Sequence, residues 1–144
     1  MSLHHKPKTW RSYRRQRGAD RKATDACPFC DIGTREPVVE EGKTMLVIRN
    51  RTKYDYFEGV PVEQHLMVIP RAHRTSLSEF TDEEVLEQAR VTGRYEKLGY
   101  HVFARGMGTK TRSVAHQHTH LIKITTKLPK LFVVVDNVGV VIAQ

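Results

Sequence analysis

Three histidines occupy alternate positions in one short segment, SVAHQHTHLIKI, over residues 113–124. They are His116, His118 and His120. Side chains in a β-strand alternate between the two faces, so the three imidazoles would share a face, about 7 Å from each to the next. Buried imidazoles need hydrogen-bond partners, which makes three of them on one face poor core residues. The pattern indicates either metal ligation or a nucleophilic histidine flanked by helpers.

The loop before this segment favours phosphate chemistry. Its sequence, RGMGTKTRS over residues 105–113, contains two glycines that let backbone N–H groups approach an anion. Its donor side chains are Arg105, Lys110, Arg112 and Ser113, which suit phosphate oxygens. A neutral imidazole is a good nucleophile near pH 7 and can bond to phosphorus. The alternative is a flexible basic loop without a ligand, which we rank second beside a histidine segment.

Cys27 and Cys30, the two cysteines of the chain, form a CxxC pair. In a reducing compartment such a pair is a redox dithiol or half of a metal site, and rarely a structural disulfide. A redox pair usually opens a helix after a strand, whereas here a basic segment precedes the pair and no helical periodicity follows. A metal half-site fits better, and it needs two further ligands from elsewhere.

Composition predicts one domain with a basic extension. The length of 144 residues suffices for a core, and no apolar run approaches a membrane span. Residues 1–25 carry eight Lys and Arg against two Asp, a charge of +6, which leaves +2 of the total +8 for the rest. We expect a flexible arm over residues 1–25 and a domain over residues 26–144. Without an apolar signal segment, we expect a cytoplasmic location.

Short strands and one helix must position these residues. Apolar runs between turn residues predict five strands, over residues 38–39, 44–50, 64–70, 101–106 and 113–124, and residues 54–61 form a predicted loop. Thr81 and Glu84 match a capping box at a helix start, and Gly99 marks the helix end. Its apolar face is predicted from the spacing of Val85, Ala89 and Leu98. Residues 131–143 predict a β-hairpin. The fold class is α+β, a mostly antiparallel five-stranded sheet with one main helix and a C-terminal β-hairpin.

Three segments together resemble the histidine triad (HIT) family of nucleotidyl hydrolases and transferases. SVAHQHTHLI resembles the family signature, QHLMVIPRAH resembles its strand-and-proline segment, and CPFC resembles the cysteine pair of its zinc-binding branch. Order and spacing agree over roughly residues 26–125. The resemblance implies a HIT-like domain, a nucleotide hydrolase or nucleotidyl transferase, and a homodimer.

The resemblance also implies a role for each matching residue. His118 would attack the α-phosphate of a nucleotide and form a covalent nucleotidyl–histidine intermediate, while His120 would contact the phosphate or the leaving group. Ser113 would donate to a phosphate oxygen, and Asn50 would bind the ribose hydroxyls. The candidates for the base pocket are Phe29 and Ile48.

Zinc follows from the same resemblance. The ligands carried over are Cys27, Cys30, His73 and His116. A Cys₂His₂ tetrahedron has no open position, so this zinc would be structural. It would leave only His118 and His120 for chemistry.

The sequence departs from the family pattern at several positions. Gln117 and Thr119 replace residues that are usually apolar, which predicts a less buried far face of that strand. Arg105 and Arg112 stand where the family commonly has amides. A more cationic pocket predicts a highly charged substrate, such as a dinucleoside polyphosphate or a nucleic-acid end.

Two other functions stay open. The basic arm, with Trp10 and Tyr13 as stacking rings, could bind nucleic acid while the HIT domain serves as a platform. Alternatively, zinc could sit on all three triad histidines as a catalytic metal. We expect the remaining histidines to be ordinary strand or tail residues: His4, His5, His65 and His101.

Overall fold

The computed structural model of the chain describes residues 4–23, 27–32, 37–126, 131–135 and 138–142, with the backbone alone over 16–23, 131–135 and 138–142. The predicted boundary between arm and domain, at residues 25 and 26, lies outside these residues, as does the predicted turn at 136–137. Among the described helices, none is long and apolar enough to cross a membrane.

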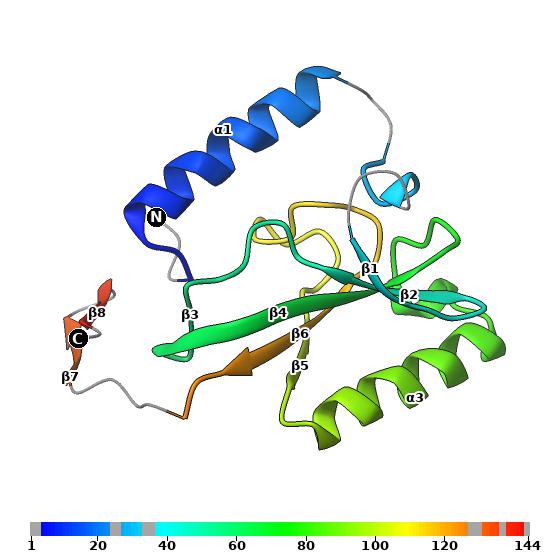
Figure 1. Cartoon of the computed structure of the whole chain (residues 1–144). Helices are drawn as coiled ribbons and strands as arrows, with labels where there is room; N and C mark the ends of the chain where they lie inside the picture. The colour runs from blue at the N-terminus through cyan, green and yellow to red at the C-terminus, as the bar shows by residue number, and fades with distance from the viewer. Residues whose placement is uncertain (1–3, 24–26, 33–36, 127–130, 136–137, 143–144) are drawn as a thin grey trace.

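An antiparallel sheet forms the centre of the fold (Figure 1). Its strands lie side by side in the order β1 (Val38–Glu41), β2 (Met45–Arg49), β4 (Val60–Pro70), β6 (Thr119–Ile124) and β5 (His101–Ala104). Strand β3 (Tyr56–Phe57) pairs with β4, which gives the sheet one strand more than the five predicted. Strands β7 (Leu131–Val135) and β8 (Val138–Ile142) pair separately as the expected C-terminal hairpin. The predicted α+β class is confirmed.

The segment predicted as a loop, residues 54–61, contains a tight hairpin. Tyr56 pairs with Pro61 and Phe57 with Val60, so residues 58 and 59 form a two-residue turn. Their φ angles are 50° and 80°. Positive φ at both central positions is type I′ geometry, whose twist matches that of the flanking strands. The glycine therefore marks a hairpin turn in an extension of β4.

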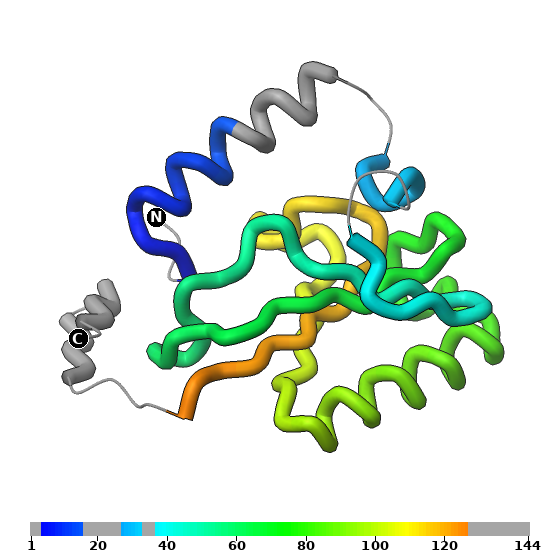
Figure 2. The backbone as a smooth tube through the Cα atoms, in the orientation of Figure 1, coloured from blue at the N-terminus to red at the C-terminus, as the bar shows by residue number. Residues whose placement is uncertain are grey.

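Helix α3 (Asp82–Lys97) covers one face of the sheet (Figures 1 and 2). The predicted capping box is confirmed, because the Thr81 hydroxyl accepts from the Glu84 N–H while the Glu84 carboxylate accepts from the Thr81 N–H. The helix ends shortly before Gly99. The φ angle of Gly99 is 85°, a left-handed conformation that glycine adopts without strain. A short 3₁₀ turn, η1 (Leu77–Glu79), precedes the helix.

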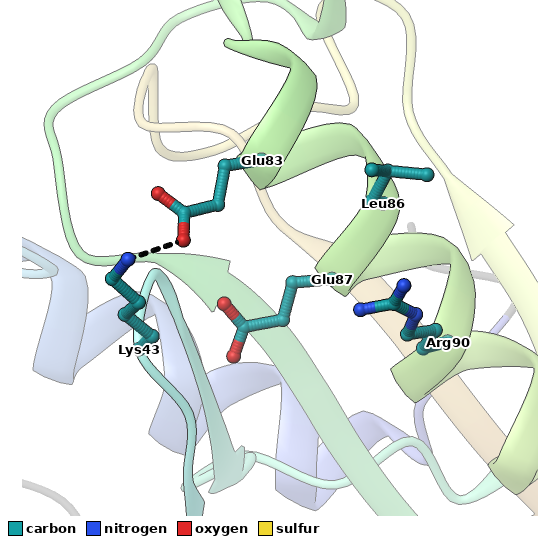
Figure 3. Close-up of a pocket in the computed structure, with 5 residues that line it drawn as sticks. All are labelled: Lys43, Glu83, Leu86, Glu87 and Arg90. Atoms are coloured by element: carbon teal, nitrogen blue, oxygen red, sulfur yellow. Dashed lines mark ion pairs between the residues drawn. The ribbon is translucent and has the colours of Figure 1, made fainter.

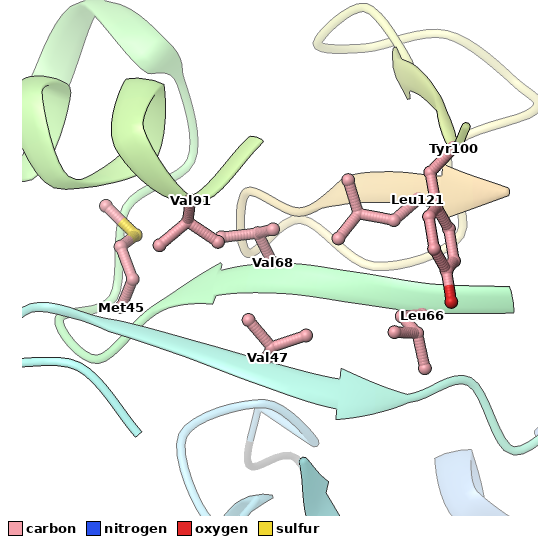
Figure 4. Packing of buried hydrophobic residues seen from close by; sticks show 7 residues of the cluster. All are labelled: Met45, Val47, Leu66, Val68, Val91, Tyr100 and Leu121. Carbon is pink, nitrogen blue, oxygen red and sulfur yellow. The ribbon is translucent and has the colours of Figure 1, made fainter. Parts of the chain in front are cut away.

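The apolar face predicted for this helix is wrong. Val85 and Leu98 are 49% and 62% exposed, whereas Val91 is buried in the core beneath the helix (Figure 4). Gln88 also points to the sheet, since its amide donates to the Thr119 hydroxyl at 3.1 Å. A buried face that includes a partnered polar residue does not stand out as an apolar stripe.

Side-chain alternation divides the sheet into two different faces. Leu66, Val68 and Leu121 pack with Val91 under α3 (Figure 4). Because neighbouring residues point to opposite faces, His65 on β4 and His120 on β6 lie on the other face. The apolar cluster of that face is Ile32, Leu46, Ile48, Met67 and Ile69, with Phe29 packed against it. The chemically reactive residues thus occupy the face that α3 leaves free.

Helix α1 (Pro7–Ala23) lies on this second side, away from α3 (Figure 1). No sequence pattern predicts this helix, whose residues fall in the expected flexible arm. Residues before the helix are bonded to the segment that leads into β3, since the backbone N–H groups of Asp55 and Tyr56 donate to the His4 carbonyl at 2.8 and 3.2 Å. This part of the chain therefore approaches the sheet on its reactive face.

Candidate functional site

The triad begins before strand β6. The strand starts at Thr119, so only His120 lies within the ladder, paired with Met67 and Phe103. The N–H of Gln117 donates instead to the Arg74 carbonyl at 2.6 Å, outside the sheet. The predicted strand over residues 113–124 is therefore too long at its start.

All three triad rings are buried, with exposed fractions of 0%, 5% and 4% along the chain. The intervening Gln117 and Thr119 are buried as well, so the expected exposure of the far side is wrong. The reason is tertiary, because the amide of Gln88 on α3 hydrogen-bonds the Thr119 hydroxyl and makes this polar side chain compatible with burial.

His118 has the geometry of a nucleophile. Its Nδ1 lies 2.8 Å from the His116 carbonyl oxygen, and because a carbonyl only accepts, Nδ1 carries the proton. The lone pair is then on Nε2. Burial lowers the pKa of His118, and the nearby charge of Arg112 lowers it further. The ring is therefore neutral near pH 7, with its basic nitrogen unprotonated.

His120 belongs to a hydrogen-bonded chain that starts at the backbone. The Tyr54 N–H donates to His65 Nδ1 at 3.1 Å, so His65 carries its proton on Nε2. That Nε2–H lies 2.9 Å from His120 Nδ1, which must accept, and this leaves the proton of His120 on its own Nε2. This last N–H is buried and has no partner among the described residues. An acceptor atom such as a phosphate oxygen would satisfy it.

Burial keeps the two hydrogen-bonded histidines, His65 and His120, neutral. It lowers the pKa of His65 to about 3 and holds the pKa of His120 well below its ordinary value. The Asn50 amide nitrogen lies 3.1 Å from His65 Nε2, which brings the residue predicted to bind ribose beside the same network. His65, expected to be an ordinary strand residue, belongs to the site. Its partner lies 55 positions away and is met only through the register of β4 against β6.

Cys27, Cys30, His73 and His116, the four ligands that the resemblance implies, lie close together. Their ligand atoms all lie within 4.8 Å of one another, a cluster that could hold a metal ion. Sγ–Nδ1 separations of 3.4 Å (Cys27–His116) and 3.2 Å (Cys30–His73) are close to the roughly 3.6 Å expected across a zinc tetrahedron. His116 Nε2 donates to the Pro70 carbonyl at 2.9 Å, so its Nδ1 lone pair faces the thiols.

The two arginines of the basic loop have different surroundings. Arg105 donates from Nη2 to the Tyr54 hydroxyl at 2.9 Å, and its charge helps to lower the pKa values of His118 and His120. Arg112 instead donates to three backbone carbonyls at 2.6 to 3.2 Å, those of Thr75, Val114 and Ala115. Its guanidinium thus braces the segment that leads into the triad.

The other predicted phosphate donors lie along the same loop. Lys110 is exposed and Ser113 is half-buried. A separate surface pocket, between α3 and the β1–β2 turn, contains no predicted site residue (Figure 3). It is lined by Lys43, Glu83, Leu86, Glu87 and Arg90.

Phe29 borders the triad on the side of the cysteine pair. Its ring centroid lies 5.3 Å from that of His118 and 6.0 Å from that of His116, edge-on in both cases. Ile48, the other residue predicted for the base pocket, is buried in the cluster against which Phe29 packs.

No family model matches the sequence, and no curated protein matches it. Several solved structures do match this chain. A HIT family hydrolase from Clostridium thermocellum is 18% identical with a TM-score of 0.55, and the match covers 76% of this chain and 99% of that one. A HIT family protein from Bacillus subtilis is 24% identical with a TM-score of 0.55, over 72% and 76% of the chains. A hypothetical protein from Leishmania major is 24% identical with a TM-score of 0.57, over 79% and 84%. The chain therefore has the fold of the histidine triad proteins.

Proposed function

We propose that this chain is a HIT-type enzyme, a nucleotide hydrolase or nucleotidyl transferase that acts at the α-phosphate. The observation that carries the proposal is the pairing of a buried imidazole with a free Nε2 lone pair on His118 and a buried, unpartnered N–H on His120. The first is a nucleophile, and the second is a donor for a phosphate oxygen. The ring centroids lie 5.0 Å apart, so both can reach one phosphoryl group.

The reaction would proceed in two displacements. His118 Nε2 forms a bond to the α-phosphorus while the bond from phosphorus to the leaving group breaks, and the leaving group departs with the electron pair. The His120 N–H hydrogen-bonds a phosphate oxygen as charge develops there. Water, or another acceptor in a transferase, then forms a bond to the α-phosphorus while the bond from phosphorus to His118 Nε2 breaks, and the acceptor's proton passes to the departed leaving group or to solvent. The electron pair returns to Nε2, which regenerates neutral His118.

The remaining predicted residues have consistent roles in this proposal. Asn50 would hold the ribose, and Arg105, Lys110 and Ser113 would hold phosphate oxygens of a nucleotide or dinucleoside polyphosphate. Arg112 would act by bracing the loop, as its three carbonyl contacts support.

We further propose that Cys27, Cys30, His73 and His116 hold a structural zinc ion. Two thiolates and two imidazoles suit zinc, and four protein ligands leave no position for substrate. The site joins the segment around the cysteine pair to the residue two positions before the nucleophile, so it would fix the His116 carbonyl that orients His118.

The test of the enzymatic proposal is turnover by a His118→Ala variant. We expect it to lose at least about a thousandfold in kcat with adenosine 5′-phosphoramidate or diadenosine tetraphosphate, since a covalent nucleophile is removed. His101→Ala, on β5, is the matched control and should keep its activity. Mass spectrometry of the wild type during turnover should show one added nucleotidyl group, absent in His118→Ala. Undiminished turnover in His118→Ala would end the proposal.

A second candidate function rests on α1, whose side chains Lys8, Arg11, Arg14 and Arg15 are exposed. We propose that this basic surface contacts nucleic acid through its phosphates. Affinity for a single-stranded oligonucleotide should fall steeply with salt. Replacing the four cations by glutamine should remove most of that slope, and an unchanged slope would exclude this surface.

We also propose a homodimer. Strand β5 is an edge of the sheet, and Val102 on it is 43% exposed. An edge strand with an apolar side chain is a surface that natural proteins usually cover. Analytical ultracentrifugation at micromolar concentration should show a dimer, and a monomer at that concentration would refute this proposal.

A further inference from the structure

The residues before α1 are fastened to the segment between β2 and β3. The His4 carbonyl accepts from the N–H groups of Asp55 and Tyr56, and the Lys6 N–H donates to the Asp55 carboxylate at 2.8 Å. The His5 ring lies 3.8 Å from the same carboxylate. Three of these four contacts use backbone atoms of residues 4–6, so they persist when the histidine side chains change.

These contacts bring four aromatic and imidazole rings together near Tyr54. We name these rings the N-terminal cluster: His4, His5, Trp10 and Tyr13. His4 lies flat on Tyr54, with centroids 4.5 Å apart and planes 9° apart, and it is near-parallel to Phe57 at 6.2 Å. His5 meets the Tyr54 ring edge-on at 5.3 Å. Trp10 and Tyr13 lie 6.2 and 5.8 Å from His5. The cluster thus covers Tyr54.

Tyr54 is itself in contact with the hydrogen-bonded pair His65 and His120. Its ring centroid lies 4.4 Å from that of His65 and 5.7 Å from that of His120, and its hydroxyl accepts from Arg105. On the opposite side, Phe29 borders His118 at 5.3 Å. The rings therefore follow one another from Phe29 through His118 and His120 to Tyr54 and His4.

Tyr54 borders the position of the leaving group. The proposed function, on which the argument rests, puts the α-phosphate at His118 and His120 and the phosphate oxygens beyond it on Arg105. Because Arg105 donates to the Tyr54 hydroxyl, the group beyond the α-phosphate extends against Tyr54. The space behind Tyr54 is filled by His4 and His5, so a bulky group can enter only by displacing them.

We infer that Tyr54 and the N-terminal cluster form a wall of the active site, and that this wall determines the size of the leaving group. A small leaving group fits against Arg105, as in a nucleoside phosphoramidate or a nucleotide with a short phosphate extension. The second nucleoside of a dinucleoside polyphosphate meets the wall. Arg105 supplies the preference for charge, and the N-terminal cluster supplies the limit on size.

The kinetic test compares two substrates that share one nucleotide. His4→Ala/His5→Ala should raise kcat/KM for diadenosine tetraphosphate about tenfold, while the value for adenosine 5′-phosphoramidate stays within about twofold. The matched control is Ser12→Ala, an exposed residue of the same segment, which should change neither value. An unchanged ratio of the two values in the double variant would overturn the wall.

A binding test does not depend on turnover or on the stability of the double variant. Trp10 is the one tryptophan of the chain, so its emission reports on the N-terminal cluster. In a His118→Ala background, AMP should bind by calorimetry without changing that emission, and diadenosine tetraphosphate should bind more weakly and change it. Tight binding of the tetraphosphate with constant emission would refute the wall alone. Absence of AMP binding together with absence of wild-type turnover would instead refute the proposed function, and the wall with it.

Discussion

His65 should make the fold sensitive to acid, and His65→Gln should relieve that sensitivity. The side chain is 2% exposed, and burial lowers its pKa to about 3. In the unfolded chain a histidine has a pKa of about 6.5. Between these two values the unfolded chain binds a proton that the folded protein excludes, so the free energy of unfolding falls as the pH drops below about 6.5. Glutamine keeps an N–H donor for His120 and does not titrate.

The magnitude follows from the two pKa values. Each pH unit in this window is worth about 1.4 kcal/mol, so the contribution of His65 between pH 7 and pH 5 is about 2 kcal/mol. The result depends little on the folded value, because at pH 5 the folded imidazole stays unprotonated for any pKa well below 5. His120, whose pKa is also lowered by burial, contributes in the same direction in both proteins. Its contribution largely cancels in the comparison.

Urea denaturation of wild type and His65→Gln at pH 7, 6 and 5 provides the assay, with the same zinc concentration throughout. We expect the variant to be less stable at pH 7, because packing and the Tyr54 N–H contact are lost, yet to lose about 2 kcal/mol less than wild type on going to pH 5. Val62→Ala, at a buried position of the same strand, controls for destabilisation as such and should follow the wild-type decline. Parallel declines in wild type and His65→Gln would refute the reasoning.

Three further changes test other parts of the structure. Cys27→Ser should abolish the binding of one zinc per chain measured by metal analysis, and zinc retained at one per chain would move the metal to the triad. Arg112→Gln should speed amide hydrogen exchange over residues 113–117, because three carbonyl contacts are weakened, and unchanged exchange would contradict the bracing role. Glu84→Ala should cost about 2 kcal/mol in urea denaturation, since it removes the capping box and leaves Arg74 without its carboxylate, and a loss under about 0.5 kcal/mol would contradict this.

The sequence alone determined the chemical inventory and much of the local structure. The alternating histidines, the cysteine pair and the strand-and-proline segment pointed through a resemblance to the fold and to the cluster of side chains that could hold a metal ion. The capping box of α3 was readable because its hydrogen bonds join residues three positions apart. Such signals involve residues that are close together in the sequence, where residue type restricts the backbone conformation directly.

Only the tertiary structure decided which distant side chains complete the site. His65 reaches His120 across 55 positions through strand register, and the exposed side of α3 followed from Gln88 meeting Thr119, 31 positions away. The placement of His4 on Tyr54 follows from backbone hydrogen bonds to Asp55 and Tyr56, for which residues 4–6 carry no sequence pattern. Contacts at these separations depend on how whole elements pack, and the free energies that select one packing are shared among many residues.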